Sequence, residues 1–333
     1  MKNIFHYLSI IALMLTISCS TNSTTNPPTQ NPVDVYVAGK KDNHACYWKN
    51  NQEVILNNEI AYSSNAIKII VSNNDVYILG TIEIETPYSL KYVFWKNGII
   101  TNLTETLSDT SQRVFDINDM DIYENDVYFV GSTKPSLLTV EQYELVYWKN
   151  GVKTVFSSNN NSPTDTFIKF RNNNIYLTGK KNILGISKKG YFVNNNFIET
   201  PQTLKGIAFK SNDVYVYGGD FNEEGTYYKN IMTGEEVSFI PGIQIYKIVF
   251  DGNDKYSSDN ISINKNNNEI YEVPFSFFDR LTDFEVLNAN TYVLTKEQES
   301  GAPGTDHLYI NNVDIFNIQI VNGAMNDIAI VQN

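Results

Sequence analysis

The chain has 333 residues, of which 42% are hydrophobic and 13% aromatic, enough to bury a full-sized core. Its 37 acidic and 25 basic residues give a net charge of −12. This charge argues against nucleic acid or an anionic membrane surface as a partner, because both require a basic footprint. No long segment repeats apolar residues at the period of a helix, so we expect an all-β protein.

The first residues have the pattern of an export signal. Lys2 precedes an apolar run over residues 4–17, which is too short to span a membrane stably. Ser18 and Cys19 follow, and a small residue directly before a cysteine at this place resembles the lipobox of bacterial lipoproteins. The resemblance implies cleavage before Cys19 and acylation of that residue. Thr16 departs from the large aliphatic residue usual in the family, although the looser lipoboxes of the Bacteroidetes accept it; the alternative is an ordinary secretory signal with a coincidental cysteine.

Three segments follow from this interpretation. Residues 1–18 form a lipoprotein signal peptide, and residues 19–32 form a lipidated cysteine with a flexible tether, since residues 20–32 hold no large apolar side chain. Residues 33–333 form the folded domain. A lipoprotein of this type implies a place in the cell envelope, at the outer membrane. The tether lacks the acidic residues typical of surface export, so a periplasmic and a surface-facing orientation both stay open.

A short motif recurs through the folded domain: Asp or Asn, any residue, then Tyr, on an apolar run. The tyrosines of its seven copies are Tyr36, Tyr77, Tyr128, Tyr176, Tyr215, Tyr256 and Tyr292. The copies lie on average about 43 residues apart, which is the length of a four-stranded propeller blade. A glycine follows three positions after the first five tyrosines, whereas the sixth and seventh copies have Asp259 and Thr295 there.

The second copy shows how one repeat divides into four strands separated by turns. The expected strands are residues 67–71, 75–80, 91–95 and 99–103. Asn97-Gly98 between the last two favours a type I′ hairpin turn, because both central residues of that turn take positive φ.

The two ends of the domain complement one another. The first copy lacks a first strand, while residues 326–331 have the pattern of a first strand with no second strand after it. We therefore predict a single seven-bladed β-propeller of four-stranded antiparallel blades, closed by pairing of the N- and C-terminal segments. The irregular sixth copy leaves six or eight blades as alternatives.

The repeat resembles the Val-Tyr-x-x-Gly…Tyr-Trp-Lys-Asn-Gly repeats of uncharacterised propeller lipoproteins of the Bacteroidetes; residues 147–151 carry the second half of that pattern. It resembles no characterised propeller family. The Trp-Asp pair of WD40 repeats is absent, and the double glycine of kelch repeats fits only once, at residues 218–219. The sialidase box, the tryptophan motifs of quinoprotein dehydrogenases and a Gly-x-Ser-x-Gly elbow are also absent, so we assign no catalytic residue.

The connections between second and third strands, and those between blades, vary most in length. In a propeller these connections share one face, called here the variable-loop face, and binding residues usually lie on such loops. Its acidic and aromatic side chains suit a cation, a cationic peptide or a sugar; the alternative is ordinary solvated surface charge. The candidate binding residues are Glu83, Glu85, Tyr88, Glu141, Tyr143, Glu144, Asp220, Glu223, Glu224, Glu297, Glu299, Asp306 and His307.

Other conspicuous residues have structural interpretations. The Asp or Asn of each motif is expected to bond to turn amides. Cys46 aligns with apolar residues and is interpreted as a small buried hydrophobe, and the three tryptophans as core packing. Residues 116–121 superficially resemble a calcium loop but lack its glycine and its final glutamate. We therefore expect no metal or other cofactor, with Ca²⁺ as a weak alternative.

Together these observations favour an exported, lipid-anchored propeller that acts as a binding or scaffold protein for a protein or glycan partner. We expect no nucleic-acid partner, and contact with a membrane only through the N-terminal lipid anchor. The alternative is a carbohydrate-active enzyme, a glycosidase or lyase, that uses paired loop carboxylates, because such pairs assemble in space and leave no local motif. It predicts a deep axial pocket with two carboxyls roughly 5 to 10 Å apart.

Overall fold

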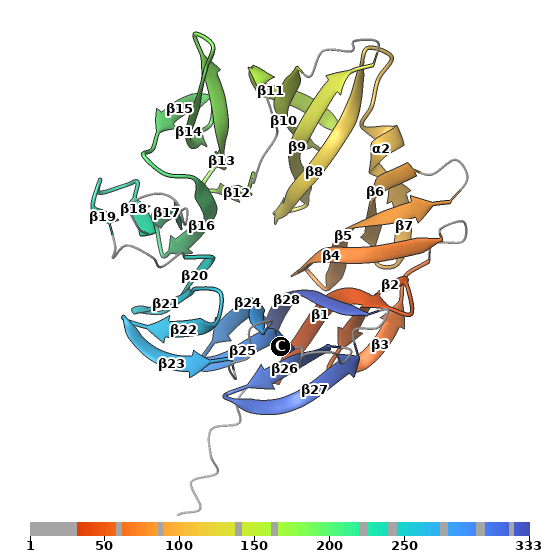
Figure 1. Cartoon of the computed structure of the whole chain (residues 1–333), viewed down its shortest axis with the longest axis vertical. Helices are drawn as coiled ribbons and strands as arrows, with labels where there is room; N and C mark the ends of the chain where they lie inside the picture. The colour runs from red at the N-terminus through yellow and green to blue at the C-terminus, as the bar shows by residue number, and fades with distance from the viewer. Residues whose placement is uncertain are drawn as a thin grey trace, which may run out of the picture. The chain divides into compact units, whose positions relative to one another are not determined.

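The computed structural model describes residues 32–57, 62–85, 89–136, 142–160, 166–219, 226–238, 245–273, 279–297, 304–319 and 323–333. One compact unit, Asp34–Val331, holds the blades. Its strands form seven four-stranded antiparallel sheets arranged as a seven-bladed β-propeller (Figure 1), which confirms the predicted fold and blade number. A second unit comprises Met1–Val33 and Gln332–Asn333, and the structure describes only residues 32–33 and 332–333 of it.

The strands of each blade are given from the innermost to the outermost. Blade one contains β28 (Ala324–Gln332), β1 (Val33–Lys41), β2 (His44–Lys49) and β3 (Gln52–Ile55). Blade two contains β4 (Ser63–Ser72), β5 (Asp75–Ile84), β6 (Ser89–Lys96) and β7 (Ile99–Asn102). Blade three contains β8 (Gln112–Tyr123), β9 (Asp126–Pro135), β10 (Tyr143–Lys149) and β11 (Val152–Asn160). Blade four contains β12 (Ile168–Arg171), β13 (Asn174–Ile183), β14 (Ile186–Val193) and β15 (Asn196–Glu199).

The last three blades keep the same order. Blade five contains β16 (Leu204–Lys210), β17 (Asp213–Gly219), β18 (Thr226–Asn230) and β19 (Glu236–Ser238). Blade six contains β20 (Lys247–Asp251), β21 (Asp254–Ser258), β22 (Ser262–Lys265) and β23 (Asn268–Glu272). Blade seven contains β24 (Arg280–Leu287), β25 (Asn290–Glu297), β26 (Thr305–Ile310) and β27 (Val313–Gln319).

The closure joins the two ends of the domain as the sequence predicts. The C-terminal strand β28 is the innermost strand of blade one and pairs with β1, so this blade is built from both ends of the chain. The helical content is small: within the described ranges the helix is the single turn α2, Leu103–Thr106. No helix in the described part of the chain is long and apolar enough to cross a membrane.

The repeated motif forms a polar clasp between the start of the second strand and the hairpin of the third and fourth strands. In blade two, Asn97 donates its side-chain N–H to the Asp75 carboxylate at 2.7 Å and accepts the backbone N–H of Val76 at 2.8 Å. Lys96 Nζ lies 2.9 Å from Asp75 and 5.0 Å from the centre of the Tyr77 ring. The motif is therefore structural: its first residue bonds to this hairpin, and in the copies with asparagine, Asn174 and Asn290, it also bonds to carbonyls of the preceding turn.

The same side-chain pair recurs along the chain. Asparagine from the hairpin donates to the first residue of the motif in the pairs Asn50–Asp34, Asn97–Asp75, Asn150–Asp126, Asn194–Asn174, Asn266–Asp254 and Asn311–Asn290. Positive φ angles at Asn97 (49°) and Gly98 (80°) confirm the type I′ turn of this hairpin.

The recurring packing positions of the repeat fill the core between blades. Trp95 is fully buried, and a Cβ placed on Gly80 would lie 2.7 Å from its ring and 2.2 Å from the carbonyl oxygen of Asn65. The glycine therefore lets β4 bulge against β5. Cys46 is also fully buried, as expected for a small hydrophobe. Burial is the main reason that the pKa of its thiol is raised to about 12.

Candidate functional site

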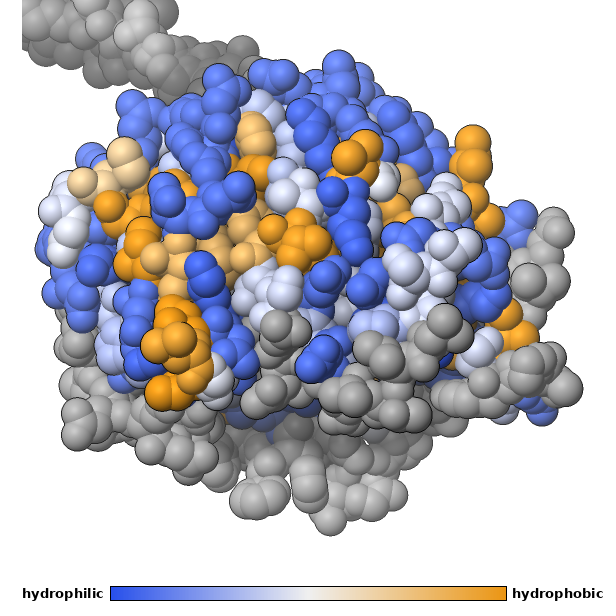
Figure 2. Space-filling view, turned by 90° about the horizontal axis from the view of Figure 1, so that it is seen from above, coloured by the Kyte–Doolittle hydropathy of each residue, from blue (hydrophilic) through white to orange (hydrophobic). Residues whose placement is uncertain are grey.

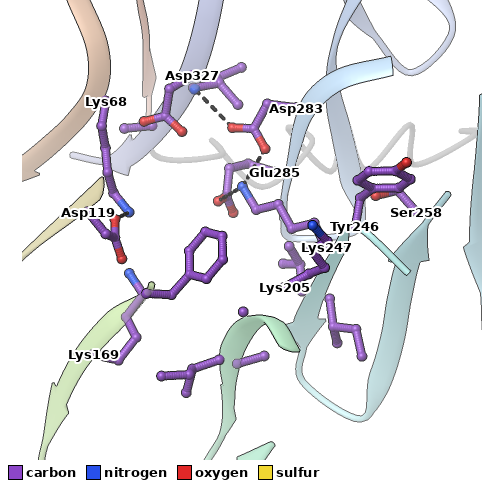
Figure 3. Close-up of a pocket in the computed structure, with 18 of the residues that line it drawn as sticks. Lys68, Asp119, Lys169, Lys205, Tyr246, Lys247, Ser258, Asp283, Glu285 and Asp327 are labelled. Atoms are coloured by element: carbon purple, nitrogen blue, oxygen red, sulfur yellow. Dashed lines mark hydrogen bonds and ion pairs between the residues drawn. The ribbon is translucent and has the colours of Figure 1, made fainter. Parts of the chain in front are cut away.

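The seven innermost strands surround an axial cavity of about 920 Å³, to which every blade contributes. Figure 3 shows charged side chains from different blades around this space. The charged residues of the lining are balanced, with five basic and five acidic side chains: Lys68, Lys169, Lys205, Lys247, Arg280, Asp119, Asp121, Asp283, Glu285 and Asp327. The cavity is thus formally neutral within a strongly acidic protein.

Ion pairs across the blades link many of these charges. Lys247 Nζ lies 2.8 Å from Asp283 and 2.7 Å from Glu285, and Lys68 pairs with Asp119. Burial alone would lower the pKa of Lys247, but the two carboxylates outweigh it and raise that pKa well above its usual value. Paired charges of this kind offset much of their own desolvation.

The same carboxylates close the exposed inner edge of the neighbouring sheet. An innermost strand has one row of backbone N–H groups without a partner inside its own sheet, and these groups need acceptors. Side chains from the preceding blade supply them in the bonds Asp283–Ile328 (3.2 Å), Asp327–Ile69 (2.8 Å) and Asp119–Ile168 (2.9 Å). The lining carboxylates therefore have a structural role in joining one blade to the next.

In blade five a tyrosine hydroxyl, and not a carboxylate, accepts the backbone N–H of the next blade. Gly206 stands on its innermost strand, and a Cβ there would fall 2.2 Å from the phenol oxygen of Tyr217. The missing side chain lets Tyr217 reach the cavity wall from the second strand. Its oxygen accepts the backbone N–H of Ile248 in blade six, and burial raises the pKa of this phenol to about 12.

Asp327 differs from the other lining carboxylates in its ionisation. Burial, followed by the negative charge of Asp283, raises the pKa of Asp327 to about 8, although Lys68 and Lys247 oppose this. In Figure 3 the two aspartates lie beside one another at the cavity wall. The raised pKa favours the protonated form of Asp327, which can donate a hydrogen bond as the acid of an acid–base pair does.

A second cluster lies on blade seven and contains two of the residues predicted from sequence. Tyr309 donates to Glu297 at 2.8 Å, and His307 Nδ1 lies 2.9 Å from Asp314. His307 Nε2 lies 3.8 Å from Glu297, so the imidazole stands between two carboxylates. Tyr271 of blade six packs against Tyr309 with ring centres 5.9 Å apart. The side chains of His307, Glu297 and Asp314 stay 16%, 24% and 37% exposed.

The neighbouring candidate Asp306 has a different role from His307, because successive residues of a strand face opposite sides. Asp306 is buried and accepts the backbone N–H of Met325 at 2.6 Å, which ties blade seven to blade one. Burial raises the pKa of its carboxyl. Asp306 is therefore part of the closure and not of an exposed binding surface.

The other described candidates are not gathered in one place. Glu144 accepts from Thr133 and Lys153, both at 3.2 Å, and Tyr143 is buried against Phe115 with ring centres 4.7 Å apart. Glu83 lies within β5. Glu85, the first residue after that strand, is exposed. The remaining candidates lie outside the described residues: Cys19, Tyr88, Glu141, Asp220, Glu223, Glu224 and Glu299.

Residues 116–121, which superficially resemble a calcium loop, lie in β8. Asp116 accepts from the Ser132 hydroxyl at 2.7 Å, while Asp119 and Asp121 accept backbone N–H groups of blade four. In the part of the chain that the structure describes, no group of three or more His, Cys, Asp or Glu residues is arranged to hold a metal ion.

Sequence reasoning missed the residues that line the axial cavity. A usable signal was present, because a charged residue interrupts the apolar run of several first strands, as Lys68, Asp283 and Asp327 do. Aligning the first strands of the copies, as well as the second and third, would have placed these residues at the axis.

Comparisons with known proteins define a fold and no family. No protein-family model matches the chain, and no curated protein matches it. The chain is 9% identical to an acylaminoacyl peptidase solved in complex with Z-Gly-Gly-Phe-chloromethyl ketone, with a TM-score of 0.50 over 86% of this chain and 52% of that one. It is 11% identical to the β-propeller domain of the trilobed protease from Pyrococcus furiosus, with a TM-score of 0.46 over 88% of this chain and 96% of that one.

These likenesses concern architecture. The chain spans about half the length of the acylaminoacyl peptidases that it matches. At such identities the match establishes a β-propeller and says nothing of a shared activity.

Proposed function

We propose that the protein is a non-enzymatic binding or scaffold protein that holds a protein or glycan partner through its variable-loop face. The observation that carries this proposal is the network of Glu297, Tyr309, His307 and Asp314 on blade seven. Glu297 ends β25, directly before the connection to β26, so the network begins at the edge of that face. Hydrogen bonds fix its side chains while they stay partly open to solvent, as in preorganised binding sites.

The chemistry of the network suits a ligand that donates hydrogen bonds. Burial and the bond to Glu297 raise the pKa of Tyr309, so the phenol keeps its proton and directs it to the carboxylate. The free lone pairs of Glu297 and Asp314 can accept from a lysine, an arginine or sugar hydroxyls. The structural bonds of the axial carboxylates support a non-catalytic role for the cavity.

The proposal is tested with a glycan array and a pull-down from envelope extract, using the wild type and two variants. Glu297→Gln and His307→Asn should each lower binding to the identified partner at least tenfold. Glu269→Gln, which matches the charge loss of Glu297→Gln at an exposed position of β23, should leave binding unchanged. Absence of any binding by the wild type, together with turnover of a polysaccharide, would contradict the proposal.

Export and lipid anchoring belong to the same proposal. Acylation of Cys19 would hold the propeller at the outer membrane of the cell envelope, with residues 20–32 as a tether. The signal and lipobox pattern of residues 1–19, which resembles that of Bacteroidetes lipoproteins, supports it.

A carbohydrate-active enzyme stays a second candidate because of one observation. Asp327, with a pKa near 8, lies beside Asp283 in a cavity large enough for sugar rings. This pair comes from the innermost strands and not from the loops where the sequence placed it. If wild-type protein cleaves a polysaccharide, Asp327→Asn and Asp283→Asn should each abolish cleavage; unchanged rates would eliminate this pair.

A further inference from the structure

The hairpin between β13 and β14 in blade four carries an apolar tip. Its two strands pair as far as Ile183 and Ile186, and Leu184 and Gly185 form the turn. Leu184 is 98% exposed, with Ile183 at 39% and Ile186 at 60%. In Figure 1 this hairpin stands at the top of the molecule, and Figure 2, seen from that side, shows hydrophobic residues interrupting a largely hydrophilic surface.

Leu184 is an unfavourable residue for this turn. Its φ of 53° lies in the left-handed region, where a leucine side chain is strained. The first position of the other two-residue turns is mostly asparagine, as in Asn73 and Asn97. Among the described non-glycine residues with positive φ, Leu184 is the only one with a large apolar side chain. An asparagine here would stabilise the fold, so the fold itself does not explain the leucine.

Four lysines form a collar behind the tip. Lys180 lies directly opposite Lys189, and Lys181 directly opposite Lys188. Like charges opposed across a strand pair destabilise it. Lys188 pairs with Glu199 at 2.9 Å, Lys181 lies 5.8 Å from the centre of the Phe197 ring, and Lys189 also has an interaction partner.

The collar also departs from the composition of the chain. Residues 179–190 contain these four lysines and no acidic residue, in a protein with a net charge of −12. The hairpin therefore combines three features that the fold does not require: a strained leucine, exposed aliphatic side chains and opposed lysines.

We propose that this hairpin docks on an anionic lipid surface, with Ile183, Leu184 and Ile186 entering the boundary between headgroups and acyl chains. Strand residues rise about 3.3 Å each, so the lysines stand roughly 7 to 13 Å behind Leu184. That matches the spacing between an interfacial apolar anchor, buried about 5 to 10 Å, and the lipid phosphates. The lysines then lie opposite phosphates, which removes their mutual repulsion.

The negative net charge of the whole chain does not exclude this contact. Exposed charges farther away than about 8 Å are largely screened at physiological ionic strength, so the local lysines determine the attraction. This proposal differs from the expectation that only the lipid anchor touches a membrane, and the test below decides between them. An acidic polymer would bind the lysines but would have no use for the leucine. The tight hairpin of blade one provides a natural control, because Lys40 and Lys41 there lie behind a polar tip, Asp42-Asn43.

The test uses a chain of residues 20–333, which lacks the anchor. Every described strand and the closure lie within residues 32–333, so this form keeps the whole described fold. Binding is measured by sedimentation with phosphatidylcholine vesicles that contain no anionic lipid or about one third phosphatidylglycerol. The wild type should bind only the anionic vesicles.

Two variants separate the tip from the collar. Leu184→Asn should weaken binding about tenfold, from the loss of one buried leucine, while raising the melting temperature. Lys180→Gln/Lys189→Gln should weaken binding about thirtyfold. Lys40→Gln/Lys41→Gln, with the same charge loss on blade one, should bind like the wild type.

Insertion is measured with an environment-sensitive fluorophore on Leu184→Cys. The buried Cys46 does not compete for the label, so emission reports the tip alone. A blue shift on anionic vesicles supports the proposal. No binding to anionic vesicles, or wild-type affinity of the folded Leu184→Asn variant for them, would overturn it. None of these outcomes depends on the network of blade seven, so failure of this proposal and failure of the partner site proposed there can be told apart.

Discussion

Replacement of Asp327 by Asn should make the propeller more stable at neutral and alkaline pH. Burial and the charge of Asp283 raise the pKa of Asp327 from its ordinary 3.8 to about 8, so the folded protein resists ionisation of this group. Below the pKa that Asp327 has in the unfolded chain, about 4, the carboxyl is protonated in both states, and its raised pKa does not change the free energy of unfolding. The cost grows as the pH rises from about 4 and is complete above about 8. Asn removes the charge and keeps an oxygen to accept the backbone N–H of Ile69.

The magnitude follows from the size of the pKa displacement. At about 1.4 kcal/mol per pKa unit, the change from 3.8 to about 8 sets an upper bound near 6 kcal/mol. Asp327 faces the cavity, where water reduces this cost, so we expect a gain of about 2–4 kcal/mol at pH 9.

Urea denaturation at pH 4, 7 and 9, followed by the fluorescence of the buried tryptophans, measures the free energy of unfolding. The gain should be near zero at pH 4 and largest at pH 9. Asp283→Asn removes the neighbouring charge, so the gain from Asp327→Asn should shrink in that background. A gain of the same size at pH 4 and pH 9, or a loss at pH 9, would refute the reasoning.

Three further predictions concern the anchor, the clasp and the core. Cys19→Ala should abolish acylation and release soluble protein, measured by lipid labelling and fractionation; retained acylation would disprove the lipobox. The hydrogen bonds from Asn97 and Lys96 lower the pKa of Asp75 in the folded protein. Asp75→Asn should therefore lower the free energy of unfolding at any pH above the pKa that Asp75 has in the unfolded chain. Urea denaturation should show this loss disappearing as the pH falls through the lowered pKa of the folded state. Gly80→Ala should destabilise the protein by about 1–3 kcal/mol, because the added Cβ would meet a carbonyl oxygen. Gly98→Ala has open space around it and should cost only the strain of a positive φ. Thermal melts measure both variants, and equal losses of stability would contradict this assignment.

The site shows how far sequence reasoning reached. It placed Glu297 and His307 together, since a second strand and the following third strand are neighbours in every blade. It wrongly grouped Asp306 with them as a surface candidate, because it did not apply the alternation of side chains along the strand. It also placed Glu83 on a loop, whereas the pairing of β5 with β6 continues to Ile84 and makes it a strand residue.

The sequence by itself determined the fold, since each blade is specified by local signals: an apolar run, an Asn-rich type I′ turn and a glycine at a fixed distance from a tyrosine. Seven such copies and one unpaired strand at each end of the domain imply a closed ring. Only the tertiary structure decided what the axis contains. Asp327 bonds to Ile69 across 258 positions of sequence, and Lys247 meets Asp283 across 36. Contacts between blades depend on how sheets twist and pack, and no local pattern carries them.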